Sequence, residues 1–351
     1  MKRLTVKQLE ENMILAETVF SSGGKPLITE GTRLTRDLID KLQEMGIIVV
    51  AVNEEGTISI DPSEVLINRV HKQALRTLGS FIPADALGER LGDAKQRYEL
   101  VTTVIEKVVR NQQVAELYLD LRTIDDDTLD HSIAVCVLSL IVGVALQLPE
   151  DRLLALGTAA MVHDIGKKTV PPDILAKRED FAPGELKKLQ DHTKEGYQRL
   201  REAGFDVTAA KVALYHHERW DGSGYNKLAG DNIDLLSRIV AVADTYDDLT
   251  RGLTYKQKYL PHEAMEFLYG AGNIYFDVRV VKAFTGSIAA YPLGSIVKLS
   301  SGEIGIVVNV HKTTAPRPIV KIFFDKDNNR LEYARQIDLS EEKTVFITKI
   351  L

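Results

Sequence analysis

Five histidines and two aspartates in this chain have residue types and spacing that could do chemistry. They are His131, His163, Asp164, His192, His216, His217 and Asp244. Imidazole nitrogen and carboxylate oxygen together suit divalent metals such as iron, manganese, zinc or nickel. Seven ligands are too many for one metal ion and about right for two. The set therefore predicts a binuclear metal site.

Each of these residues also has a purely structural interpretation. A lone histidine on an apolar helix face is usually a hydrogen-bonded core residue, and a lone aspartate after an apolar run is usually a helix cap. Here, however, five of the eight histidines fall between positions 131 and 217, each beside an apolar helical run. Independent accidents of packing would not cluster in this way. Metal binding is the better interpretation.

The first two positions of this set follow helix signals. His131 comes after the acidic run Asp125-Asp126-Asp127-Thr128, which is typical of a helix start because carboxylates complement its positive end. His163 and Asp164 follow the apolar run of residues 153–162, so they are expected at the end of a buried helix with their side chains directed inward.

The remaining positions follow the same pattern. His192 is expected on one helix spanning residues 186–200, and His216-His217 ends the apolar run of residues 207–215. Asp244 lies in a helix so apolar that an unpaired carboxylate there would be costly. Each ligand therefore has a helix or a helix end to position it.

Composition and charge limit the class of protein. A chain of 351 residues predicts two or three domains, and a net charge of -6 argues against a protein that binds DNA through a broad basic surface. The single cysteine, Cys136, cannot form an internal disulfide, and no signal peptide is seen in the first twenty residues, so a cytoplasmic location is expected. The uncharged stretch Ser132 to Leu148 is interpreted as a buried core helix, without membrane insertion.

The pattern of apolar and turn-forming residues divides the chain into four parts. Residues 1–61 alternate short apolar runs with turns and predict a small α+β module, with Thr35 as a helix N-cap. Residues 62–118 predict a helical connector, and residues 119–290 an all-helical domain. Residues 291–351 carry short β-branched runs and predict a small β-barrel-like module. The fold class is therefore mainly α, with a small β-containing module at each end.

The order and spacing of the candidate ligands resemble the HD-GYP subgroup of the HD phosphohydrolase superfamily. The resemblance covers roughly residues 119–285 and rests on His163-Asp164-Ile165-Gly166-Lys167 and on the specific run His216-His217-Glu218-Arg219-Trp220-Asp221-Gly222-Ser223-Gly224-Tyr225. It implies a cytoplasmic phosphodiesterase that hydrolyses cyclic di-GMP, or a related cyclic dinucleotide, to a linear dinucleotide or GMP.

The resemblance also implies residue roles. The metal ligands would be the seven residues named above, with Asp164 bridging two divalent ions, iron or manganese, and Asp127 is a candidate ligand for a third ion. Two such metals about 3.5 to 4 Å apart activate water and neutralise phosphoryl charge. Asp164 and Lys167 would be catalytic, Lys167 by stabilising charge on the phosphoryl oxygens. The substrate-binding set would be Lys167, Asp221, Gly222, Tyr225, Arg251 and Lys256.

The chain departs from the subgroup at two positions. Asn226 follows Gly224-Tyr225 where the subgroup has proline, which loosens this loop without removing a ligand. Leu253 stands where a phosphate-binding arginine is usual, and Arg251 is the nearest candidate substitute.

These departures keep two alternatives open: a catalytically weak receptor for cyclic dinucleotides, and a phosphohydrolase acting on another nucleotide. A homodimer or a signalling partner protein is a further expectation.

Overall fold

The computed structural model describes residues 2–20, 26–45, 47, 49–52, 62–81, 92–124, 126–177, 180–252, 258–310 and 317–351. The chain forms two compact units, Met1–Val65 and Leu66–Leu351. The predictions for Leu253 and Lys256 concern residues outside those that the structure describes.

The first unit is a small α+β module with its own core. Strand β1 (Lys2–Thr5) pairs antiparallel with β4 (Val49–Val52), and β2 (Val19–Phe20) pairs antiparallel with β3 (Pro26–Ile28). A short 3-10 helix, η1 (Val6–Gln8), follows β1. The predicted cap is confirmed, because the Thr35 side chain accepts a hydrogen bond from Leu38 N at the start of α1 (Arg36–Glu44). Of the apolar run of residues 13–20, only Val19–Phe20 forms a strand element, and β1 was not predicted from the sequence.

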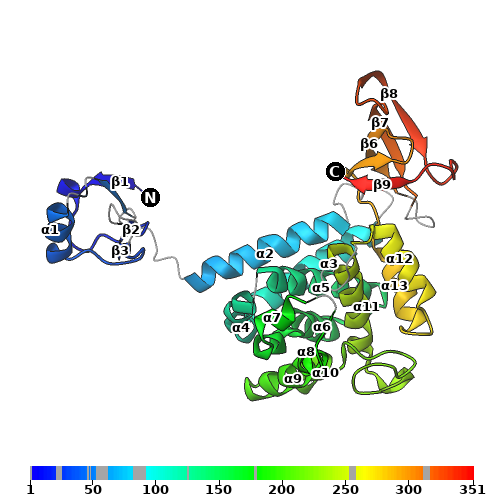
Figure 1. Cartoon of the computed structure of the whole chain (residues 1–351), viewed down its shortest axis with the longest axis horizontal. Coiled ribbons are helices and arrows are strands. Elements are labelled where there is room, and N and C mark those ends of the chain that lie inside the picture. Colours follow the sequence, from blue (N-terminus) through cyan, green and yellow to red (C-terminus); the bar gives the residue numbers. More distant parts are fainter. Residues whose placement is uncertain are drawn as a thin grey trace. The chain divides into compact units, whose positions relative to one another are not determined.

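The second unit is largely helical (Figure 1). Its helices begin with α2 (Pro62–Phe81), α3 (Gly92–Val109), α4 (Gln112–Ile124), α5 (Asp126–Ala145), α6 (Glu150–Val162), η3 (Ile165–Thr169) and α7 (Pro172–Leu175). They continue with α8 (Glu185–Gln190), α9 (His192–Glu202), α10 (Val207–Tyr215), η4 (Gly230–Asn232), α11 (Leu235–Arg251), α12 (Pro261–Gly270) and α13 (Val278–Ser287).

Helix α5 lies at the centre of this unit. It packs against α3, α4, α6, α11 and α13. Among the described residues, Asp127–Ala145 is long and apolar enough to cross a membrane, but 89% of that window is buried inside the structure. The burial is what the sequence predicts for a core helix.

One predicted helix is divided. Residues 186–200 were expected to form a single helix, but α8 ends at Gln190 and α9 begins at His192. The His192 ring explains the break, because its Nδ1 bonds the carbonyl oxygen of Leu189 at 2.5 Å, in the turn that precedes α9. The interruption places His192 at a helix start.

The C-terminal strands form one antiparallel sheet in the order β8-β7-β6-β5-β9. The strands are β5 (Ile296–Leu299), β6 (Ile304–Asn309), β7 (Ile319–Phe324), β8 (Arg330–Asp338) and β9 (Ile347–Ile350). The predicted barrel is not closed, because β8 and β9 lie at opposite edges of the sheet. Strand β8 was not predicted, since most of its side chains are exposed and polar.

Candidate metal centre

The seven predicted metal ligands converge from five places in the chain. His131 lies on α5, His163 and Asp164 follow α6, and His192 begins α9. His216 and His217 follow α10, and Asp244 lies in the middle of α11. All seven come from the helical unit, and none but His217 is more than 4% exposed.

Asp164 is at the centre of the cluster. Its Oδ2 lies 3.4 Å from His163 Nε2 and 3.7 Å from His131 Nε2. Its Oδ1 lies 3.5 Å from His192 Nε2 and 3.8 Å from His216 Nε2. The two oxygens therefore face two different groups of histidines. This is the arrangement required of a carboxylate that bridges two cations.

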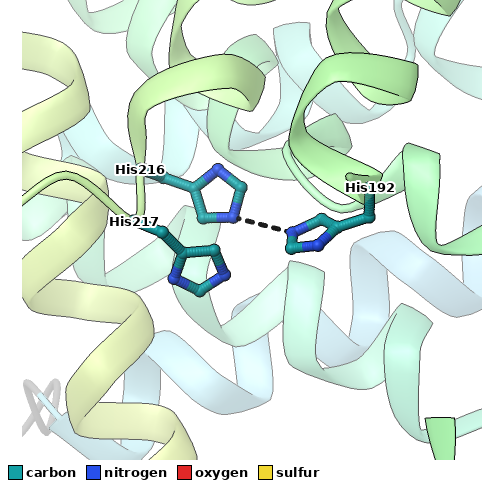
Figure 2. A group of neighbouring side chains, drawn as sticks. All are labelled: His192, His216 and His217. Atoms are coloured by element: carbon teal, nitrogen blue, oxygen red, sulfur yellow. Dashed lines mark hydrogen bonds between the residues drawn. The ribbon is translucent and has the colours of Figure 1, made fainter. Parts of the chain in front are cut away.

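Asp244 is the second carboxylate of the cluster and lies close to three of its histidines. Its Oδ1 lies 3.0 Å from His131 Nε2 and 3.6 Å from His163 Nε2, and its Oδ2 lies 3.8 Å from His217 Nδ1. Within the described part of the chain, three groups have ligand atoms within 4.8 Å of one another: His192, His216 and His217; His131, His163 and Asp164; and His131, Asp244 and Asp248. The first of these is drawn in Figure 2.

Three histidine rings are oriented by backbone carbonyls. The Nδ1 atoms of His163, His192 and His216 bond the carbonyl oxygens of Ala160, Leu189 and Val212, at 2.7, 2.5 and 3.1 Å. In a neutral ring, Nδ1 then carries the proton and Nε2 keeps a lone pair. Each of these histidines therefore presents a lone pair to the centre.

The charge state of these rings favours a cation at the centre. Burial lowers the pKa of His192, lowers that of His216 to about 3, and holds that of His217 well below its usual value, so all three are neutral near pH 7. The Nε2 atoms of His192 and His216 lie only 3.4 Å apart (Figure 2). With both protons on Nδ1, two lone pairs face each other there, and a cation between them would relieve the repulsion.

The carboxylates are ionised. Burial alone would raise the pKa of Asp164, but the positive charge of Lys167 holds it well below its usual range. Burial alone would also raise the pKa of Asp244, but its hydrogen bond with His131 and the nearby histidines hold it well below its usual range. The site therefore combines the anionic oxygens of Asp164 and Asp244 with the neutral nitrogens of His192, His216 and His217, protonation states that suit metal binding.

Two buried atoms at the centre have no hydrogen-bond partner among the described residues. They are His163 Nε2 and Asp164 Oδ1. An unsatisfied buried polar atom is costly, and these two belong to the same cluster of ligand atoms. The donor set and these two atoms fit a pair of divalent cations.

Two residues near the site were not predicted from the sequence. Asp247 is buried, and its Oδ2 lies 2.7 Å from His131 Nδ1. Asp248 belongs to one of the three ligand groups and lines the adjacent cavity. Both lie within one turn of Asp244 on α11, so the helical repeat after Asp244 was the signal that could have found them.

The cluster opens onto a cavity of about 490 Å³. Its lining includes His131, His192, His217 and Asp244 together with Lys167 and Tyr225. A cavity of this size suits a small molecule. The Lys167 ammonium lies 2.5 Å from Asp164 Oδ2, at the boundary between cavity and cluster.

The other predicted substrate-binding residues have different surroundings. Asp221 is exposed, and its Oδ1 accepts a hydrogen bond from Ser223 N, in a turn where Gly222 has φ +82°. Arg251 is paired with Asp247 at 2.8 Å, and its Nη2 donates to the Asp130 carbonyl oxygen. Asp127 lines the cavity, but its side chain is exposed and it belongs to none of the three ligand groups.

The loop containing Asn226 is hydrogen-bonded to the side chain of Glu218. The buried Glu218 carboxylate accepts hydrogen bonds from Asn226 N, Asn226 Nδ2 and Leu228 N, at 2.6, 3.1 and 2.8 Å. A Cβ at Gly224 would lie 2.4 Å from Glu218 Cα, so only glycine permits this close approach. The loop is therefore fixed by hydrogen bonds at the position where proline is usual.

Comparisons with known proteins agree with this geometry. The model of the HD domain matches residues 106–280, and that of the KOW domain associated with HD domain matches residues 296–351. A helical unit with a histidine and aspartate centre of this kind defines an HD-type protein. The chain belongs to the HD-GYP family of HD-domain proteins.

Curated relatives are similar over the same region. The cyclic di-GMP phosphodiesterase PA4108 of Pseudomonas aeruginosa is 35% identical over 234 residues, which cover 66% of this chain and 56% of the relative. The cyclic di-GMP phosphodiesterase response regulator RpfG of Xanthomonas campestris is 37% identical, covering 41% and 39%. The 3'3'-cGAMP-specific phosphodiesterase 2 of Vibrio cholerae is 33% identical, covering 38% and 26%. The chain thus spans just over half the length of PA4108 and less than half the length of the other two relatives.

Among solved structures, Bd1817, an HDG"Y"P protein from Bdellovibrio bacteriovorus, aligns with a TM-score of 0.45 and 15% identity. The alignment covers 81% of this chain and 97% of that one.

Proposed function

We propose that this chain is a metal-dependent phosphodiesterase that hydrolyses a cyclic dinucleotide, with cyclic di-GMP as the principal substrate. The observation that carries the proposal is the convergence of four histidines on Asp164, within a cluster of seven candidate ligands beside a cavity of about 490 Å³. The names of the relatives support the class of substrate.

Two divalent cations, iron or manganese, are proposed for the cluster. The first would be held by His131, His163, Asp164 and Asp244, and the second by His192, His216 and His217 with the other oxygen of Asp164. When bound, such ions activate water and neutralise phosphoryl charge. A third ion would take the group containing Asp248, with Asp127 as a further candidate.

The chain's own residues would bind and orient the phosphodiester. Lys167 carries a positive charge beside Asp164, and its pKa is raised because Asp164, Asp248 and Asp244 outweigh the effect of burial. It therefore stays protonated at neutral pH and can donate to a phosphoryl oxygen as negative charge develops there. Tyr225, with its ring 4.8 Å from that of His217, forms a wall of the cavity.

The remaining assignments are proposals as well. Residues 119–290 would form the catalytic domain, 62–118 the connector, 1–61 an N-terminal module and 291–351 a C-terminal module, in a cytoplasmic protein. Asp221, Gly222, Arg251 and Lys256 remain candidate substrate contacts. The chain would act as a homodimer or with a signalling partner protein.

The experiment is turnover by the full chain with iron or manganese supplied anaerobically, against cyclic di-GMP, 3'3'-cGAMP, cyclic di-AMP and other nucleotides. The double variant His163→Ala/Asp164→Ala is expected to lose both bound metal and hydrolysis. Full activity in that variant would refute the metal-centre assignment. If the chain hydrolyses only another nucleotide, that nucleotide takes the place of cyclic di-GMP in the proposal.

A receptor with weak turnover is the second candidate function. The observation that favours it is the Arg251 guanidinium, which is engaged by Asp247 and the Asp130 carbonyl oxygen. Tight binding of cyclic di-GMP without product, in the metal-loaded chain, would establish the receptor and exclude the enzyme.

A further inference from the structure

Among the described residues, three cationic side chains other than histidines line the cavity beside the metal centre: Lys167, Lys177 and Arg219. Two are already paired, because Lys167 Nζ lies 2.5 Å from Asp164 Oδ2 and Lys177 Nζ lies 2.5 Å from Glu185 Oε2. Arg219 has no ion pair within the described parts of the chain, and its buried Nη1 has no hydrogen-bond partner there. Of these three described cations, Arg219 is the one without a hydrogen bond or ion pair from its side chain.

The Arg219 side chain is held in place without using its donors. Its Cζ lies 4.9 Å from the centroid of the Phe276 ring, and Phe276 is itself buried. The backbone on either side is fixed, because Glu218 N donates to Tyr215 O at 2.9 Å and Trp220 N donates to Tyr275 O at 2.8 Å. A guanidinium stacked on an aromatic ring and carried by an anchored backbone loses little freedom when it binds a ligand.

The chemistry of the site indicates what this guanidinium would bind. A buried Arg donor without an acceptor is costly, and the planar fork matches two oxygens of a phosphate. Arg219 lines the same cavity as His217 and Lys167, which places it beside the centre. The neighbouring candidate, Arg251, is engaged by Asp247.

We propose that Arg219 is a substrate-binding residue that donates to the non-bridging oxygens of a phosphate in the bound cyclic dinucleotide. This inference rests on the proposed substrate class but not on hydrolysis. Arg219 would supply the bidentate phosphate contact that Arg251 does not provide.

Two substitutions separate this role from packing. Arg219→Met keeps an apolar chain against Phe276 and removes the charge, whereas Arg219→Lys keeps the charge and removes the fork. The matched control is Arg152→Met, because Arg152 is exposed on α6 and does not line the cavity. Metal content and the Trp220 fluorescence spectrum check that each variant keeps its fold; if Arg219→Met does not fold, Arg219→Lys carries the test.

The measurement is the dissociation constant of cyclic di-GMP for the full chain, in chelator so that no turnover occurs, followed by KM and kcat with metal. Both Arg219 variants are expected to weaken binding by about tenfold or more, because a charge-assisted bidentate contact is lost. With metal, we expect KM to rise more than kcat falls. The Arg152→Met control should bind as the unchanged chain does.

Three results would overturn the inference. The first is unchanged affinity in a folded Arg219→Met variant, which would mean that the side chain only packs. The second is a loss confined to cyclic di-GMP and absent with cyclic di-AMP, which would mean that Arg219 contacts a guanine edge. The third is no binding of any cyclic dinucleotide by the unchanged chain. Binding that depends on Arg219 without any hydrolysis would support this inference while refuting the proposed enzyme.

Discussion

Asp247 shows how a residue outside the predicted ligand set can control the centre. Its carboxylate lies 2.7 Å from His131 Nδ1 and 2.8 Å from Arg251 Nε, so it orients the ring whose Nε2 faces Asp244 and Asp164. Burial alone would lower the pKa of His131, but its hydrogen bonds to Asp244 and Asp247 raise it well above its usual value. A carboxylate behind a ligand histidine fixes the ring and increases its basicity.

We expect Asp247→Asn to weaken binding of divalent metal by about 10- to 100-fold, because the amide keeps the shape but loses the charge behind His131. The measurement is competition with a chelator at fixed pH. Asp151→Asn, an exposed aspartate in the first turn of α6, is the control and should leave the affinity unchanged. Equal metal affinity in Asp247→Asn and the unchanged chain would show that Asp247 has no such role.

At the level of residues, the sequence could indicate types but not partners. The seven candidate ligands were recognisable because each stands beside an apolar run and their order resembles a family. The helical repeat after Asp244 places Asp247 on the same helix face, but neither the contact of Asp247 with His131, 116 residues away, nor the contact of Arg219 with Phe276 could be predicted from the sequence. Their surroundings arise only when the helices pack.

Among the elements, η3 and α9 can pack this closely only because residue 166 is a glycine. A Cβ at Gly166 would lie 1.9 Å from the His192 carbonyl oxygen and 2.5 Å from Gly196 N, which are both backbone atoms that cannot rotate away. The close contact brings His163-Asp164, just before η3, next to His192 at the start of α9. The spacing of these two elements therefore sets the spacing of the ligands.

We expect Gly166→Ala to destabilise the chain by about 1–3 kcal/mol through overpacking and to reduce bound metal. Urea unfolding and metal analysis measure the two effects. Gly286→Ala on α13 is the control, because no atom lies within 4 Å of its Cβ position and alanine favours a helix. Full metal content together with unchanged stability in Gly166→Ala would contradict this account of the contact.

Asp120 connects three elements by charge. From α4 it pairs with Lys168 of η3 and with Arg199 of α9. Burial alone would raise its pKa, but these two partners lower it below its usual value. A carboxyl group whose pKa is depressed in the folded state contributes stability above its unfolded pKa of about 3.9, and that contribution disappears as the pH falls through the folded pKa.

The Asp120→Asn substitution should therefore lower the free energy of unfolding at pH 7 by about 1 kcal/mol, a modest value because both cations are partly exposed and screened. The difference between variant and unchanged chain should shrink as the pH falls below about 4. Glu150→Gln, which removes the more exposed pair with Lys107, is the control and should cost less. A difference that does not vary between pH 7 and pH 3 would rule out the ion pairs as its cause.

At the level of elements, the spacing of apolar residues predicted helix ends correctly but did not predict an exposed edge strand or the closure of a sheet. The apolar runs before His163 and His216 correctly located the ends of α6 and α10. Strand β8 was not predicted, because it lies exposed at the edge of the sheet and its sequence shows no alternation of apolar and polar residues. Closure of the C-terminal sheet could not be predicted, since strand runs do not specify which edges pair.

At the level of the whole molecule, the two units have separate cores. The core of the first unit is formed by Leu15, Leu34, Leu42 and neighbouring apolar residues, and all the candidate ligands lie in the second unit. The single tryptophan, Trp220, also lies in the second unit, three residues after His217. Its fluorescence therefore reports unfolding of the unit that would hold the metals.

We expect metal to stabilise the second unit alone. A ligand that binds only the folded state stabilises it by about 2.7 kcal/mol at a concentration one hundred times its dissociation constant. Adding manganese to chelator-treated chain should therefore shift the unfolding transition followed by Trp220 fluorescence to higher temperature. The transition of the first unit, followed by calorimetry, should not move, because no candidate ligand belongs to its core. The His163→Ala/Asp164→Ala variant should show neither shift. Equal shifts of both transitions, or a shift that survives in the double variant, would mean that the metal acts elsewhere than at Asp164.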